Sequence, residues 1–204
     1  MADKLVVEIF KLKTADQFSK SLSEKDSRLE AVSAAAAAAS NACALARRAA
    51  LIAKDGIKDN ERLDYIDRNL EIVRGYMVHL IDEDVKSRGP LNRARREGAA
   101  REIEACIQPA TCIAAEVINM MSQCLGFMNE LAGICPAGAM HYLGEAAELA
   151  VSALRSCRLY ILNMIKGSTD DTYLYVTRKE NQVALDDSLA VYASIIEKVE
   201  TALK

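Results

Sequence analysis

Tryptophan is absent from this 204-residue sequence, aromatic residues make up only 5% of it, and there are three prolines. With 51% hydrophobic residues, such a composition favours an all-helical protein over the classes built on β-sheets. The length suits one domain that buries a core of its own, so we predict a single domain over residues 1–204. Within it, residues 1–26 are expected to form an N-terminal arm and a short helix.

Neither sign of charge dominates, because 26 basic residues are set against 29 acidic ones and the formal net charge is -3. This balance gives no argument for binding nucleic acid or an anionic membrane. The apolar patch at the start, in MADKLVVEIFKLKT, is broken by Glu8 and Lys11 and is far shorter than the ~20 apolar residues of a membrane span. We therefore expect neither a membrane segment nor a nucleic-acid partner.

Several motifs of common enzymes are also missing. The sequence has no GxGxxG, P-loop, HExxH or GxSxG pattern, which argues against dinucleotide, NTP, zinc-protease and serine-hydrolase chemistry. No two of the six cysteines form a CxxC pair and no secretory signal precedes them, so we read them as reduced, mostly buried thiols of a cytoplasmic protein. Cys135, in a loop before Pro136, is the best candidate for a cysteine nucleophile, but no histidine is adjacent to it in sequence.

Alanine is what the sequence has in abundance. The stretch from Ser27 to Ala53, SRLEAVSAAAAAASNACALARRAALIA, predicts a helix that neighbouring helices or a flat ligand can approach closely. Apolar spacing, capping residues, glycines and prolines predict further helices, with a strand or extended arm over Lys4 to Lys13. After a short helix capped by Thr14, the long helices are expected over about 27–54, 59–89, 91–107, 109–133, 140–166 and 170–203.

These segments predict an all-α fold, an antiparallel bundle of about six helices joined by short turns. Residues 111–128 and 146–165 are apolar around much of the helix circumference. Such helices need neighbours on both sides, so we expect a homodimer.

The end of the second long helix presents the best constellation of polar residues. His79, Asp82 and Glu83 have i, i+3 and i+4 spacing and therefore share one helical face. A histidine beside two carboxylates can act as a general acid or base, or can ligate a divalent metal with Asp84 completing the set. The alternative is a solvated acidic helix end with a pendant histidine. Three acids at a helix C-terminus are disfavoured by the helix dipole, which favours a functional role.

Basic residues follow this acidic segment. Arg88 and Arg93, within a cluster that continues to Arg101, can bind the carboxylates or the phosphate of a ligand through forked guanidinium contacts. They can equally pair with neighbouring glutamates. At the opening of the fifth long helix, His141 lies near a positive helix end, which favours a neutral, proton-accepting imidazole. Its alternative role is capping or packing.

In the order of its segments, the sequence resembles the cyclodeaminase/cyclohydrolase family, all-helical dimeric enzymes of one-carbon folate metabolism. The resemblance begins near residue 18 and rests on four features in order. A short helix with Phe18 precedes an alanine-rich helix that begins near Ser33, and LIDED, Leu80 to Asp84, closes the next helix as an acidic L-I-x-x-D does in the family. Pro109 matches a V-P segment, and Met140 to Asn163 matches a helix of the pattern S-D-x-x-x-A with N-x-x-x-N.

The departures from the family pattern fall on its polar positions. A family P-G-G-G-S turn becomes LEAV, residues 29–32, before Ser33, which indicates that the turn has become helix. The S-D pair falls on Met140 and His141, and the aromatic residue expected four positions after the aspartate is Arg88. The first asparagine of N-x-x-x-N is Leu159, while Asn163 is retained.

The resemblance implies two alternative functions. In the first, the protein is a folate one-carbon enzyme with a remodelled site, either a formiminotetrahydrofolate cyclodeaminase or a methenyltetrahydrofolate cyclohydrolase, with a tetrahydrofolate derivative as substrate, no tightly bound cofactor and no metal. In the second, it is a non-catalytic helical dimer that acts as a ligand-binding or assembly module. The expected catalytic residues are Asp84, His141 and His79, and the expected ligand-binding residues are Glu30, Ser33, Asp82, Glu83, Arg88, Arg93 and Asn163.

Overall fold

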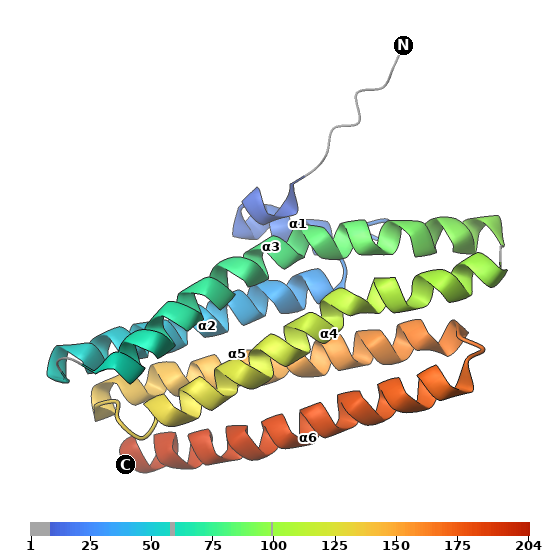
Figure 1. Cartoon of the computed structure of the whole chain (residues 1–204). Coiled ribbons are helices and arrows are strands. Elements are labelled where there is room, and N and C mark those ends of the chain that lie inside the picture. Colours follow the sequence, from blue (N-terminus) through green and yellow to red (C-terminus); the bar gives the residue numbers. More distant parts are fainter. Residues whose placement is uncertain (1–8, 58–59, 99) are drawn as a thin grey trace.

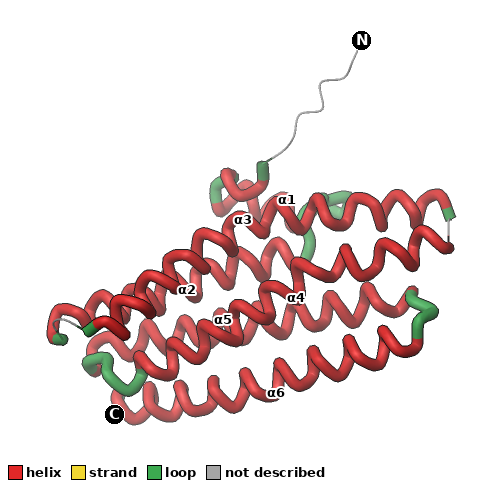
Figure 2. The backbone as a smooth tube through the Cα atoms, in the orientation of Figure 1, coloured by secondary structure: helices red, strands yellow, loops and turns green. Residues whose placement is uncertain are grey.

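Five long α-helices lie side by side along a common direction in the computed structural model, which describes residues 9–57, 60–98 and 100–204 (Figure 1). They are α2 (Ala31–Gly56), α3 (Glu61–Glu97), α4 (Ala100–Leu131), α5 (Ala137–Met164) and α6 (Asp171–Ala202). The smaller elements are η1 (Phe10–Leu12), α1 (Ala15–Ser23) and η2 (Ile165–Gly167). Figure 2 shows helices joined by short loops, and the described residues contain no strand, so the predicted all-α bundle is confirmed.

The alanine-rich helix α2 lies at the centre of the bundle and packs mainly against α3 and α5. Its buried face is almost entirely alanine, and α5 presents a second series of buried alanines toward the core. Small side chains let helix axes approach closely, which explains why so much alanine is found in a helix that is covered from both sides. Two serines, Ser33 and Ser40, are the polar members of that buried face.

Two prolines that were expected to separate helices lie inside helices. Pro90 is within α3 and Pro109 within α4, so the predicted helix over 91–107 does not exist as a separate element. The helices continue because the residues that follow each proline are anchored in the core: Leu91 is 1% exposed and Ala110 is 1% exposed. The turn between α3 and α4 is instead at Gly98, whose φ of 70° suits a residue without a side chain.

The N-terminal segment also departs from the prediction. The described part of the expected strand or arm forms the 3-10 turn η1, packed against α3 through the buried ring of Phe10. Helix α1 begins as predicted at Thr14, in a capping box with Gln17. Helix α2, however, begins at Ala31 rather than at Ser27, because Glu30 is extended and Leu29 lies outside any helix. The interpretation that residues 29–32 had become helix therefore holds for only the last two.

Helix α4 is long and apolar enough to cross a membrane by length and composition, with a mean hydropathy of 1.2 over its best window. In the bundle it packs against α2, α3, α5 and α6. This is the environment of a core helix, which passes the same composition test. All six cysteines are free thiols; three are buried, and Cys43 contacts Cys124 with the two sulfur atoms 3.8 Å apart.

Candidate functional site

A buried carboxylate joins α2 to α3 at the point where α2 begins. Asp84 has no exposed surface, and its Oδ2 accepts a hydrogen bond of 2.6 Å from the hydroxyl of Ser33. Ser33 itself is fully buried and lies in the first turn of α2, 51 positions away in sequence. The bundle has therefore brought together two of the residues that the family resemblance singled out.

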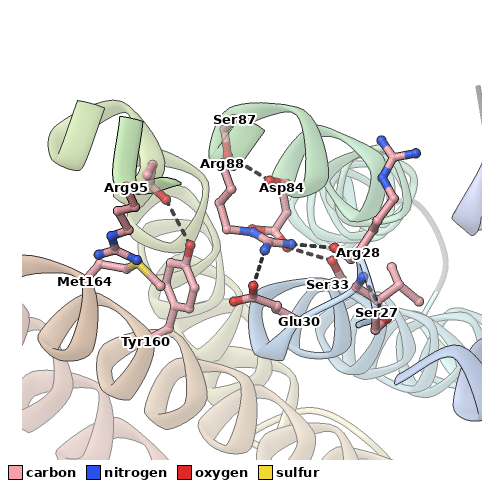
Figure 3. Close-up of polar contacts among 12 residues, drawn as sticks. Ser27, Arg28, Glu30, Ser33, Asp84, Ser87, Arg88, Arg95, Tyr160 and Met164 are labelled. Carbon is pink, nitrogen blue, oxygen red and sulfur yellow. Dashed lines mark hydrogen bonds and ion pairs between the residues drawn. The ribbon is translucent and has the colours of Figure 1, made fainter. Parts of the chain in front are cut away.

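Arg88 is hydrogen-bonded to the same carboxylate. Its Nε is 3.2 Å from Oδ1 of Asp84, and its Nη2 is 3.3 Å from Oδ2 (Figure 3). The same guanidinium donates through Nη1 to Glu30 and through Nη2, at 2.7 Å, to the backbone carbonyl of Arg28. The Arg88 side chain is only 4% exposed, so it is a buried cation with hydrogen-bond acceptors around its plane.

The two acids and one arginine form a compensated cluster. Burial of an isolated charge would cost several kcal/mol, and here each buried charge has an opposite charge within hydrogen-bond distance. Glu30 is the N-cap residue of α2, and Asp84 is hydrogen-bonded to the first turn of the same helix. Both carboxylates thus lie at the helix end where the dipole favours negative charge. Glu30 is the accessible member, with 39% of its side chain exposed.

A phenol from α5 lies beside this cluster. Burial, with a further contribution from the negative charge of Asp84, raises the pKa of Tyr160, and its hydroxyl faces the carbonyl of Ala110 at 3.4 Å. Next to it, Nη1 of Arg95 lies 3.8 Å from the sulfur of Met164 (Figure 3). The phenol is therefore protonated at neutral pH and can serve only as a neutral donor or as packing.

The predicted constellation of His79, Asp82 and Glu83 does not converge with Asp84. The side chain of His79 is half exposed, and its Nε2 lies 3.6 Å from Glu83. Asp82 is directed toward the N-terminal segment, where it accepts a 2.8 Å hydrogen bond from the backbone N–H of Phe10. Glu83 is paired with Lys86 at 2.6 Å, a contact that lowers the pKa of Glu83. Among the described residues no three His, Cys, Asp or Glu side chains are grouped as a metal would require, so the metal-site alternative finds no support here.

His141 lies at the other end of the bundle. Its ring centroid is 3.8 Å from that of Tyr142, and the Tyr142 ring is covered by Arg48 at 4.4 Å. Arg48 and Ser33 are fifteen residues apart on α2, which corresponds to about 22 Å along the helix axis. Within one chain, His141 and Asp84 therefore cannot act on the same small group. The expectation that the two would share proton transfer does not hold for the single chain.

The remaining predicted residues lie on the surface. Arg93 is exposed on the C-terminal part of α3, and Asn163 is exposed near the end of α5. The structure thus groups Glu30, Ser33, Asp84 and Arg88, and leaves the other predicted residues outside the cluster. The i, i+4 spacing of Asp84 and Arg88 was a readable signal for their pairing. Tyr160 carried no such signal, because its sequence neighbours are apolar.

The comparisons with known proteins agree with this fold. A family model described as formiminotransferase-cyclodeaminase matches residues 14–183. Among solved structures, the crystal structure of formiminotetrahydrofolate cyclodeaminase from Thermotoga maritima superposes with a TM-score of 0.79 at 18% sequence identity, covering 95% of this chain and 96% of that one. No curated protein matches the sequence. At this identity the structural match establishes a shared fold.

Proposed function

Because this chain belongs to the formiminotransferase-cyclodeaminase family, we propose that it binds a tetrahydrofolate derivative at a remodelled site and does not catalyse the family's one-carbon reaction through Asp84. The observation behind this proposal is the guanidinium of Arg88, which lies on both oxygens of the Asp84 carboxylate.

The contact between Arg88 and Asp84 matters because it occupies the carboxylate that a cationic ligand would need. A protonated formimino group is a planar cation with N–H donors, and a carboxylate would recognise it by the same type of contact that a guanidinium makes. In this chain Arg88 already makes that contact, and Ser33 donates a further hydrogen bond to Oδ2 of Asp84. A general acid or base must be within hydrogen-bond reach of the substrate. Asp84, with no exposed surface, does not meet this requirement.

A reachable carboxylate remains at the edge of the cluster. Glu30 replaces a glycine of the family turn and is partly exposed, so it is the acid that a cationic ligand can approach. The exposed arginines 93, 95 and 96 follow on the same stretch of α3 and offer partners for carboxylates at the other end of such a ligand. We further propose a homodimer, as expected from the resemblance to a family of dimeric proteins.

A second candidate function is catalysis with Glu30 as the proton carrier. The observation that favours it is the retained pair of Ser33 and Asp84, which fixes Arg88 and through it the carboxylate of Glu30. In this version the reaction is opening of 5,10-methenyltetrahydrofolate by water, or loss of ammonia from the 5-formimino compound.

The deciding experiment has two parts. Isothermal titration calorimetry with 5-formyltetrahydrofolate measures binding, and the absorbance decay of 5,10-methenyltetrahydrofolate measures turnover above the spontaneous rate. A separate assay for ammonia release covers the 5-formimino compound. Glu30→Gln and Asp84→Asn are compared with wild type. The control is His141→Ala, because His141 lies on α5 at the opposite end of the bundle from Asp84.

Each outcome distinguishes one interpretation. Binding without turnover, weakened by Glu30→Gln and unaffected by His141→Ala, is the result we expect. Turnover that Glu30→Gln abolishes would establish the second candidate. If the Asp84→Asn variant lost turnover while the Glu30→Gln variant stayed active, the substrate would reach Asp84 in spite of Arg88. The proposal would then be wrong. Absence of both binding and turnover would leave an assembly role.

A further inference from the structure

A groove between α5 and α6 lies outside the Asp84 cluster and has a different character. The two helices lie side by side along the bundle (Figure 1), and the groove between them has a volume of about 470 Å³. This volume is within the range of small-molecule sites in proteins. Its cationic lining consists of Arg158 on α5 and of Arg178 and Lys179 on α6.

These three cations are not neutralised by carboxylates. In the part of the chain that the structure describes, none of them forms an ion pair with an acidic side chain. Some other arginines of the long helices do have such a partner, as in the 2.8 Å contact between Arg47 and Asp67. Three positive charges against the single carboxylate of Asp171 give the lining of this groove a net positive charge, in a chain whose net charge is -3.

Arg158 is the least exposed of the three. It is half-buried, and its Nη2 donates to Oε1 of Gln182 across the groove. Gln182 in turn donates from Nε2 to Asp186 at 2.8 Å, which fixes its amide orientation. The Nε of Arg158 is buried and has no hydrogen-bond partner among the described residues. A neutral amide therefore holds the guanidinium in place without neutralising it, and one of its donors is unsatisfied.

Apart from Asp171 and Gln182, the rest of the lining is apolar or aromatic. Leu162 and Leu174 line the groove, and Tyr175 stands beside it with 65% of its surface exposed. The ammonium of Lys179 lies 5.9 Å from the centre of that ring. Asp171, at the start of α6, is the acidic residue of the lining and disfavours a ligand that is negatively charged along its whole length.

We propose that this α5–α6 groove binds a small molecule that carries one oxyanion group, a carboxylate or a phosphate, on a planar apolar body. The oxyanion lies among Arg158, Arg178 and Lys179, and the planar body packs on Tyr175 and the two leucines. Guanidinium groups match the geometry of both oxyanions. The groove shares no lining residue with the Asp84 cluster, so this proposal is independent of the folate-like ligand.

NMR titration of the ¹⁵N-labelled full chain tests the proposal. The probes are phenyl phosphate and benzoate, which distinguish phosphate from carboxylate, and inorganic phosphate, which lacks the planar body. The variants Arg178→Gln and Lys179→Gln remove one exposed charge each, and Arg68→Gln, an exposed arginine of α3, matches their change in net charge.

We expect saturable shifts confined to residues of α5 and α6 around the groove, for at least one of the two aromatic probes. Affinity should be highest for an aromatic probe, and each groove variant should weaken it about tenfold while Arg68→Gln leaves it unchanged. Loss of saturable shifts for all three probes would overturn the proposal. So would equal weakening by Arg68→Gln, because the binding would then reflect only the overall charge.

Discussion

Replacing Arg88 by methionine is expected to destabilise the fold strongly. Methionine keeps the apolar stem of the side chain but removes the guanidinium. Asp84, which has no exposed surface, then keeps Ser33 as its remaining side-chain partner, and Glu30 loses its contact as well. A buried carboxylate without its cation is the source of the expected loss.

Its magnitude follows from the contacts. Removing one partner of a buried ion pair typically costs about 3–5 kcal/mol, and domains of this kind are stable by about 5–15 kcal/mol in total. The variant should therefore remain folded but unfold at much lower urea.

Urea unfolding at pH 7, followed by circular dichroism, measures the effect. Arg93→Met, an exposed arginine on the same helix, is the control and should change the free energy of unfolding by less than about 0.5 kcal/mol. The double variant Asp84→Asn with Arg88→Met should recover much of the loss, because no unpaired charge remains. A loss below about 1 kcal/mol for Arg88→Met, or no recovery in the double variant, would refute the reasoning that the cluster is a compensated buried charge system.

Three further changes test the packing and the surface ion pairs. Partial burial alone would raise the pKa of Asp67, but the hydrogen bonds from Lys54 and Arg47 lower it. The ion pairs of Asp67 therefore stabilise the fold fully above the unfolded-state pKa of this carboxyl. This stabilisation is lost as the pH falls through the lower pKa of the folded state. Asp67→Asn should thus cost about 0.5–1 kcal/mol at pH 7 and nothing in strong acid, as urea unfolding at both pH values would reveal. Pro90→Ala should raise the thermal midpoint, since it restores a helical N–H donor at an exposed position; an unchanged or lower midpoint would show that the proline fits α3 without cost. Ala39→Leu, at a fully buried position of α2, should lower the free energy of unfolding by about 1–3 kcal/mol or more, whereas a neutral effect would mean that the helices can separate to admit it.

The helices that the sequence predicted well are those with strong local signals. Thr14 and Asp170 cap α1 and α6 as the sequence indicated, and the alanine run forms the central helix. The errors fall at Pro90 and Pro109, where the local rule for a helix end was overruled by core residues on both sides of each proline. The actual turn is at Gly98, a residue to which the prediction gave no weight beside the two prolines.

For the candidate site, the sequence predicted which residues take part but not which of them contact one another. All four residues of the buried cluster were predicted as site residues from the sequence and its family resemblance. Arg88, however, was expected to face a ligand and instead lies on Asp84. His79 and Asp82 are on the same helix as Asp84, but neighbouring residues of a helix point to different faces. The packing of η1 and α2 against α3 decides which partners each face contacts.

The sequence by itself determined the helical class, because composition, apolar spacing and capping residues act over a few residues and do not depend on distant partners. It also determined which residues are too polar to be buried without compensation. The tertiary structure alone decided which of them compensate one another, since the contacts between Ser33 and Asp84 span 51 positions and arise only when α2 packs against α3. Likewise, the separation of His141 from Asp84 follows from the length of α2, a distance that no local pattern records.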